Sequence, residues 1–204
     1  MSGVCILDYG SGNVNSVKNA FNQLNIDSFV SNEISSIRNA SHIVLPGVGT
    51  FGTAMQRIQN SIPILVLREE VMDKGKPYLG ICVGMQVLAE WGHEYGKHQG
   101  LGWLPGSEVH ANKKEVRQPH IGWNNVSIKQ DSSLLNSLEN ETDFYFVHSY
   151  VMRNIKSENV IATTSYGFEF PSIIQKENIY GVQFHPEKSQ RAGLKLIKNF
   201  SSIS

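Results

Sequence analysis

The N-terminal part of the chain alternates between short apolar runs and stretches with helical periodicity. Its apolar runs are typical of buried strands and lie at Val4–Leu7, Ser28–Val30, Ile43–Leu45 and Tyr78–Ile81. Helices are predicted over residues 14–24, over residues 55–75, where Pro63 opens the second half and Gly75 ends it, and from Cys82 through Ala89. Parallel strands joined by helices form an open sheet with both faces covered. The pattern therefore predicts an α/β fold with a mainly parallel central sheet.

From about Gly100 the chain becomes rich in glycine, proline and short β-type runs, which predicts hairpins or an antiparallel extension of the same sheet. These runs are Asn125–Ile128, Phe144–Val147, Val160–Thr164, Ser172–Gln175 and Tyr180–Phe184. The spacing of Leu194, Ile197 and Phe200 predicts a last amphipathic helix. Because 204 residues is the length of one typical domain, we expect residues 1–204 to form a single domain.

The charge and cysteine content exclude several classes of protein. The 18 basic and 18 acidic side chains balance, which argues against nucleic acid or an anionic membrane as the main partner. The most apolar stretch, Ile62–Leu67, is far shorter than the roughly 20 residues that span a bilayer. No secretory signal is expected at the N-terminus, and two cysteines do not make a disulfide framework. We therefore expect a cytoplasmic protein with reduced thiols.

Cys82 lies between two glycines at a predicted strand-to-helix junction. The sequence Gly80-Ile81-Cys82-Val83-Gly84 has the form of a nucleophile elbow with cysteine in place of serine. A sharp, strained turn there would crowd any flanking Cβ atom, and the start of a helix would favour the thiolate. A buried structural cysteine is the alternative; we prefer that interpretation for Cys5, which lies inside an apolar run.

A thiolate nucleophile needs a base, and the base needs a group that orients it. His185 and Glu187 are two residues apart at the end of a predicted strand, so their side chains leave the same side of an extended chain. Pro186 between them restricts the backbone. An isolated histidine would more often be a packed or solvated residue, but next to the elbow this pair is predicted to be the base and its orienting carboxylate.

The glycine-rich loop Pro46–Gly52 follows another predicted strand. It lacks the Gly-Lys-Ser/Thr of a phosphate loop, and the context of a dinucleotide fingerprint is missing. If parallel strand ends bring this loop next to the elbow, it would offer a second backbone N–H for an oxyanion; otherwise it is a flexible turn.

The remaining histidines give little support for a metal site. His93 and His98 are five residues apart without a second pair, so no metal or cofactor is predicted. His120 and His148 flank β-type segments, where they would either line a pocket or pack.

These motifs together resemble the class I, triad-type glutamine amidotransferases, and within them the glutaminase subunit of imidazole glycerol phosphate synthase. The matching segments are Asp8–Asn13, Pro46–Gly49, Leu79–Gln86, Pro119–Asn124, Phe146–Tyr150 and Gly181–Ser189. The resemblance implies hydrolysis of L-glutamine through a cysteinyl thioester, with Cys82 as nucleophile, His185 as base and acid, and Glu187 as orienter. It also implies an oxyanion hole from Val83 and the Val48–Gly49 peptide, completed by a flip of that peptide. The positions implied to hold glutamine are Gly49, Gln86, His148, Ser149 and Tyr150.

The resemblance further implies that the chain is half of an enzyme. Its partner would be a (β/α)8-barrel cyclase, which uses the ammonia to make imidazole glycerol phosphate and aminoimidazole carboxamide ribotide in histidine biosynthesis. Asn13, Asn15 and Lys188 would face this partner; for each, a solvated polar residue is the alternative. Two other enzymes remain open, a similar glutaminase that supplies ammonia for amino sugars of surface polysaccharides, and a stand-alone γ-glutamyl hydrolase. A regulatory module that has lost the chemistry is disfavoured by the intact triad.

Overall fold

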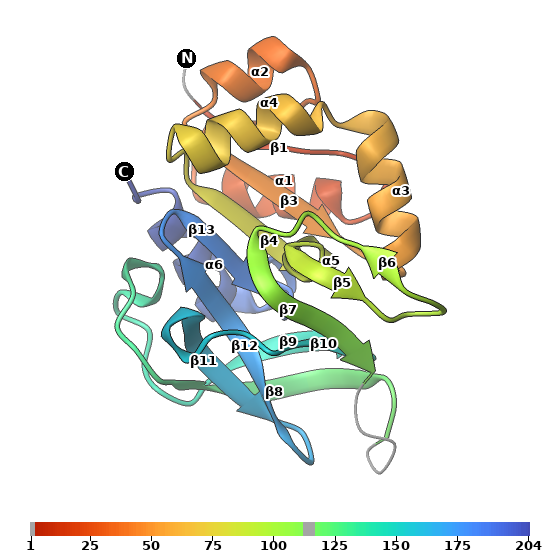
Figure 1. Ribbon diagram of the computed structural model, residues 1–204. Coiled ribbons are helices and arrows are strands. Elements are labelled where there is room, and N and C mark those ends of the chain that lie inside the picture. The colour runs from red at the N-terminus through yellow and green to blue at the C-terminus, as the bar shows by residue number, and fades with distance from the viewer. Residues whose placement is uncertain (1–2, 112–116) are drawn as a thin grey trace.

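A computed structural model describes residues 3–111 and 117–204, and over these residues its largest element is a nine-stranded sheet (Figure 1). Across the sheet the strands run β2 (Ser28–Val30), β1 (Val4–Ile6), β3 (His42–Gly47), β4 (Tyr78–Cys82), β13 (Ile179–Val182), β12 (Glu169–Lys176), β11 (Val160–Ser165), β8 (His120–Ile128) and β9 (Thr142–His148). Pairing is parallel from β2 to β13 and antiparallel from β13 to β9. The predicted parallel sheet with an antiparallel extension is confirmed.

Helices cover the parallel half of the sheet on both faces, which is why its inner strands are buried along their whole length and largely apolar. Helices α1 (Val14–Gln23) and α6 (Gln190–Phe200) contact each other on one face, whereas α2 (Ile34–Asn39), α3 (Phe51–Ser61) and α4 (Ile64–Arg68) lie on the other (Figure 1). The apolar stripe of α6 buries Ile197 and Phe200, as their spacing predicts, together with Leu196, whereas the predicted Leu194 is only half-buried at the edge of the core.

The long helical stretch predicted after the third strand is divided at Pro63. α3 ends at Ser61, α4 begins at Ile64, and one π-helical turn, Glu69–Asp73, continues α4. Gly75 follows with a positive φ of 72°. Buried Glu70 in this turn pairs with Lys74 and Lys76 at 2.6 and 2.8 Å.

The sequence predicts that the helix after β4 continues through Ala89, and this extent is wrong. α5 spans only Val83–Gln86, and β5 (Ala89–Gly92) follows. Val87, Leu88 and Ala89 are fully buried, and a short buried apolar run has no periodicity that separates helix from strand. The electrostatic contribution of so short a helix to Cys82 is correspondingly small.

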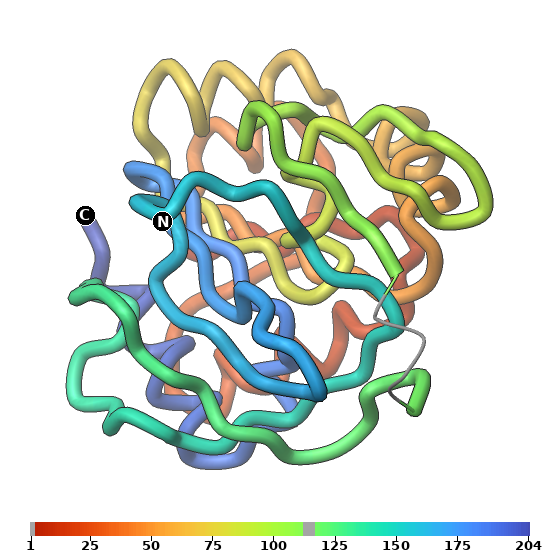
Figure 2. Tube along the Cα trace, turned by 60° about the horizontal axis from the view of Figure 1, so that its bottom comes forward, coloured from red at the N-terminus to blue at the C-terminus, as the bar shows by residue number. Residues whose placement is uncertain are grey.

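A second sheet, absent from the sequence prediction, packs beside the first. Its strand order is β10 (Tyr150–Arg153), β7 (Leu104–Ala111), β5 and β6 (His98–Gln99). β10 and β7 are far apart in the chain yet pair antiparallel, and their traces run side by side in Figure 2. In this sheet β7 lies between β10, which follows His148, and β5, which follows α5. Residues at or next to β10 and β5 line the candidate site.

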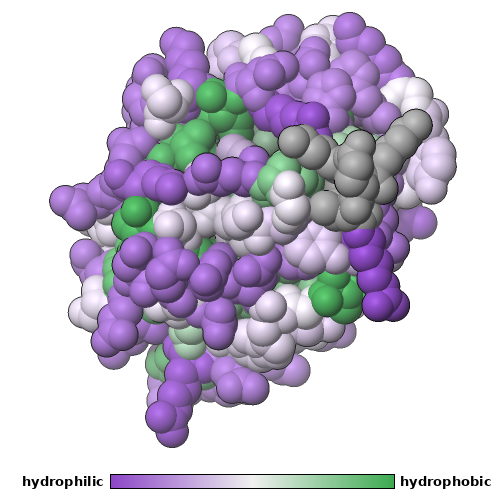
Figure 3. Space-filling view, turned by 90° about the horizontal axis from the view of Figure 1, so that it is seen from below, coloured by the Kyte–Doolittle hydropathy of each residue, from purple (hydrophilic) through white to green (hydrophobic). Residues whose placement is uncertain are grey.

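Among the described helices, none combines the length and the apolarity that crossing a bilayer requires. The face seen from below in Figure 3 is mostly hydrophilic, with hydrophobic side chains in small separate patches. Single exposed apolar residues of this kind are normal on a protein surface.

Candidate active site

Cys82 has the strained backbone that a nucleophile elbow requires. Its φ and ψ are 54° and −109°, at the junction of β4 and α5. A Cβ on Gly84 would overlap the Leu45 carbonyl oxygen of the neighbouring strand, and a Cβ on Gly80 would overlap the Gly84 carbonyl oxygen. Both glycines are therefore required by close backbone approach, as the sequence predicts.

The sheet brings His185 and Glu187 to Cys82. β13 lies beside β4 in parallel register, with Gly181 opposite Gly80, so the two strands end at the same edge. Nδ1 of His185 lies 2.8 Å from Oε1 of Glu187, and the side chains are 2% and 0% exposed. Nε2 of Gln183 donates toward Cys82 Sγ at 3.7 Å. Cys82 and His185 interact through a hydrogen bond and line the same cavity, so the three residues predicted to be nucleophile, base and orienter lie in one buried cluster.

The electrostatics of this cluster favour a charged imidazole. Burial by itself would lower the pKa of His185, but the negative charge of Cys82, hydrogen bonding to it and the carboxylate of Glu187 raise that pKa to about 10. Burial would raise the pKa of Glu187, but the hydrogen bond and charge of His185, together with Asn13, lower it. The imidazole of His185 is thus held in its charged form between Cys82 and the carboxylate of Glu187.

Two polar residues position the cluster, and the sequence did not identify them in this role. Nδ2 of Asn13 donates to Oε1 of Glu187 at 3.1 Å. Oγ of Ser189 donates to the His185 carbonyl oxygen at 2.7 Å and accepts from the Tyr145 amide at 2.9 Å. Asn13 and Ser189 lie in segments that carry the resemblance, but no local pattern shows what they would bond.

A cavity of about 250 Å³ opens above the Cys82 sulfur. Its lining includes every residue predicted for the oxyanion hole and for glutamine binding, together with three that were not predicted, Glu94, Pro119 and Val147. The predicted members are Val48, Gly49, Cys82, Val83, Gln86, His148, Ser149, Tyr150, His185 and Lys188. The sequence missed Glu94 because it follows a strand of the unpredicted second sheet.

Hydrogen bonds fix the walls of this cavity. Nε2 of Gln86 donates to the Tyr150 carbonyl oxygen and to Oε1 of Gln183, both at 3.0 Å. Nδ1 of His148 lies 3.1 Å from the Tyr150 carbonyl oxygen, and its Nε2 lies 3.1 Å from Nδ1 of His120. Burial, and then the neighbouring His120, lower the pKa of His148 to about 3, so this wall is neutral near pH 7.

The loop after β3 contributes Val48 and Gly49 to the lining of the cavity. Gly49 has a φ of 100°, a conformation that favours glycine, and Val48 is 39% exposed. Oε2 of Glu94 accepts from the Phe51 amide at 2.7 Å and so caps the start of α3, where Thr50 makes no side-chain cap. Glu94 therefore connects this loop to the second sheet.

The three residues predicted to face a partner differ in their surroundings. Asn13 is buried and bonded to Glu187, Asn15 is exposed, and Lys188 is exposed at the cavity. The internal bond gives Asn13 a role besides any partner contact. Contact of all three with a partner remains a prediction.

Comparison with known proteins is consistent with this geometry. The family model for class-I glutamine amidotransferase matches residues 5–202. A Vibrio vulnificus protein named imidazole glycerol phosphate synthase subunit HisH 2 is 45% identical over 97% of this chain and 92% of its own length. A HisH subunit from Salinibacter ruber is 42% identical over 97% of this chain and 93% of the relative.

Solved structures share the fold at lower identity. A crystal structure described as a glutamine amidotransferase superposes with a TM-score of 0.76 at 20% identity, covering 98% of this chain and 97% of the other. The structure of PurLQS from Thermotoga maritima contains a chain with a TM-score of 0.75 at 18% identity, covering 98% of each chain. The fold, the Cys82 elbow and the full-length match agree, and the chain belongs to the class-I glutamine amidotransferase family.

Proposed function

We propose that this chain is the glutaminase subunit of an imidazole glycerol phosphate synthase, and that residues 1–204 act as one glutamine amidotransferase domain. The observation that carries the proposal is the buried row of Cys82, His185 and Glu187 at the floor of a cavity of about 250 Å³. The full-length relatives that carry the HisH name supply the pathway.

The reaction is acyl transfer in two steps. The Cys82 thiolate attacks the side-chain amide carbon of glutamine, and a carbon–sulfur bond forms as the carbonyl oxygen becomes an oxyanion. His185 gives its proton to the amide nitrogen, the carbon–nitrogen bond breaks and ammonia leaves. Water then attacks the thioester while His185 takes a proton from it, and glutamate leaves with the thiolate restored. Glu187 keeps the imidazole in one orientation through both steps.

The oxyanion is stabilised by backbone amides on two sides of the sulfur. Val83 follows the nucleophile at the first position of α5, where an amide has no partner within the helix. Val48 and Gly49 line the same cavity, and we infer that the peptide between them supplies the second donor, with a flip of this peptide as the step that completes the hole. The left-handed φ of Gly49 makes such a flip inexpensive, because glycine has no Cβ to obstruct it.

Charged groups at the cavity suit an amino acid. Glu94 and Lys188 both line the cavity: the carboxylate of Glu94 is suited to the α-ammonium group of glutamine, and the ammonium group of Lys188 is suited to the α-carboxylate. Gly49, Gln86, His148, Ser149 and Tyr150 enclose the remainder of the substrate. The neutral state of His148 adds no charge that would compete with Lys188 for the carboxylate.

Ammonia made in this cavity is used by a partner subunit. We place a (β/α)8-barrel cyclase over the face that carries Asn15 and Lys188, beside the triad. The partner converts the ammonia to imidazole glycerol phosphate and releases aminoimidazole carboxamide ribotide. With both cysteines free, a reducing cytoplasm is the location proposed. No cofactor takes part in these steps.

The proposal is tested by following the amide nitrogen. The chain is mixed with a histidine-pathway cyclase subunit, its precursor substrate and glutamine that carries heavy nitrogen in the side-chain amide. We expect the label in imidazole glycerol phosphate. A parallel mixture contains a synthase for surface amino sugars in place of the cyclase. Transfer of the labelled nitrogen only to the amino sugar would reassign the pathway. Fast glutamine hydrolysis by the chain without any partner would favour a stand-alone hydrolase.

A further inference from the structure

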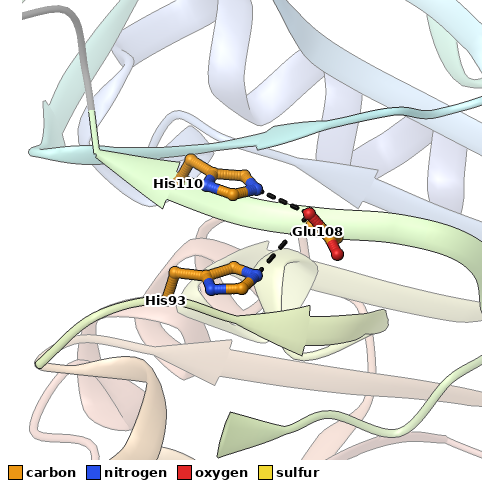
Figure 4. Close-up of side chains that lie close together, drawn as sticks. All are labelled: His93, Glu108 and His110. Atoms are coloured by element: carbon orange, nitrogen blue, oxygen red, sulfur yellow. Dashed lines mark hydrogen bonds and ion pairs between the residues drawn. The ribbon is translucent and has the colours of Figure 1, made fainter. Parts of the chain in front are cut away.

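Three potential metal ligands converge on the second sheet, away from the triad. His93, Glu108 and His110 point their ligand atoms at one another, and these atoms all lie within 4.8 Å (Figure 4). None of the three lines the cavity above Cys82. The glutaminase reaction as derived above does not use them.

The pairing of two strands explains the convergence. Glu108 and His110 alternate along β7, so their side chains leave the same face. β5 pairs in parallel with β7, Gly92 lies opposite Val109, and the His93 amide donates to the Val109 carbonyl oxygen at 2.9 Å. His93 therefore comes next to His110, and the two rings stack with centroids 4.3 Å apart and planes 13° apart. His98, the nearest histidine in the sequence, takes no part.

The spacing of the donor atoms approaches that of a metal site. Oε2 of Glu108 lies 2.7 Å from Nε2 of His110 and 3.5 Å from Nε2 of His93. Donors bound to one zinc ion at about 2.0–2.2 Å lie roughly 3.4 Å from each other in a tetrahedral arrangement. Nε2 of His93 is shielded from solvent and has no hydrogen-bond partner among the described residues. Small shifts and a tilt of one ring would direct both nitrogens at a shared ion.

The chemistry of the three groups also suits a divalent cation. One carboxylate oxygen of Glu108 faces the Nε2 nitrogens of both histidines. Two imidazoles and one carboxylate are a ligand set that zinc and similar first-row ions accept, with water at the fourth position. The side chains are 31%, 29% and 35% exposed, which leaves an entry path for the ion and its water.

We propose that His93, Glu108 and His110 bind one zinc-class divalent cation per chain. The ion would join the end of β5 to β7, directly before Glu94, which lines the glutamine cavity and caps α3. Its role is that of a clamp on the second sheet. The site is independent of the proposed glutaminase function, since none of its ligands touches the triad.

Zinc binding to the full-length, untagged chain tests the site. The background is Cys82→Ala, because the Cys82–His185 pair would itself bind zinc. Competition with a chromogenic chelator should give one zinc per chain. Saturating zinc, at about 100 times the dissociation constant, should raise the melting temperature by about 5 to 10 °C.

Matched histidine variants assign the ligands. His93→Gln and His110→Gln should each weaken zinc binding at least about 10-fold, whereas His98→Gln should leave it unchanged. Circular dichroism checks that each variant folds. If a histidine variant does not fold, Glu108→Gln replaces it in the test, because it keeps the shape of the side chain and should weaken zinc binding by the same factor. Absence of stoichiometric binding, or equal affinity in all of these variants, would overturn the proposal.

Discussion

Nδ1 of His185 lies 2.8 Å from Oε1 of Glu187, in a site where neither side chain is appreciably exposed to water. The carboxylate is thus the fixed anion that holds the imidazole toward Cys82 and supports its positive charge. In the proposed mechanism the glutaminase activity depends on this contact, since a rotated or neutral imidazole could not give a proton to the departing ammonia.

Replacing Glu187 by glutamine tests the orienting role. The amide keeps the shape but removes the anion, so we expect glutamine turnover in the complex with the cyclase to fall roughly 10³- to 10⁴-fold, with KM little changed. Steady-state kinetics of ammonia release measure both constants. Turnover equal to that of the unchanged chain would remove Glu187 from the triad.

Cys82→Ala separates the nucleophile from the rest of the enzyme. Glutamine-dependent synthesis by the complex should be abolished, while synthesis from added ammonia should continue, because the partner's chemistry is untouched. Cys5→Ala is the matched control: the Cys5 side chain is fully buried in the core, and its Sγ donates to the Ser31 carbonyl oxygen at 3.3 Å. It should cost about 1 kcal/mol of stability and leave glutamine use intact. Loss of both activities in Cys82→Ala would mark a structural residue.

Asn13 and Asn15 offer a matched pair for separating positioning from partner contact. Asn13→Ala removes the donor at 3.1 Å from Glu187, and a hydrogen bond to a charged group is worth about 1.5–3 kcal/mol. We expect kcat to fall about 10- to 100-fold with a shifted pH profile and little change in KM. Asn15→Ala should leave kcat at saturating partner unchanged. If Asn13→Ala altered only the affinity for the cyclase, the bond to Glu187 would have no catalytic role.

Buried neutral histidines predict a loss of stability in acid. Burial lowers the pKa of His120 to about 4, below the value near 6.5 of an unfolded chain. Between these two pKa values His120 is protonated in the unfolded chain but neutral in the folded chain. The free energy of unfolding therefore falls as the pH falls through this range. The loss for His120 between about pH 7 and about pH 5 should be roughly 1–2 kcal/mol.

Urea unfolding at the two pH values measures this loss. His120→Gln should show a smaller difference between them, whatever its absolute stability. The ring of His120 stacks on Tyr166 with centroids 4.0 Å apart, so the variant loses packing at both pH values alike. An unchanged difference between the two pH values would show that His120 is not held neutral.

The strand-to-helix motifs could be predicted from the sequence because each carries its own local signal. The glycines around Cys82 mark an elbow, and the His185–Glu187 pair is rigid and two residues apart, so chemistry and neighbourhood agree. The second sheet has no such signal. β5 has four residues, of which two are only half-buried, and β6 has two residues. Their sheet depends on the pairing of β5 with β6 and with β7, which the local sequence does not indicate. Glu94 was missed with this sheet, and so was the approach of His93 to Glu108.

The close packing of Gly84 against β3 leads to a prediction about the elbow. Gly84→Ala would place a Cβ into the Leu45 carbonyl oxygen, a backbone atom that cannot move without disturbing β3, so we expect a loss of about 3 kcal/mol in unfolding free energy. Gly75→Ala is the comparison, because Gly75 has a φ of 72° but open space around it, and its cost should be only about 1 kcal/mol. Urea unfolding gives both values. Alkylation of Cys82 by a glutamine analogue should be slower in Gly84→Ala than in Gly75→Ala, because only the change at Gly84 displaces the strained turn that presents the sulfur. Equal alkylation rates in the two variants would mean that the elbow tolerates a side chain at position 84.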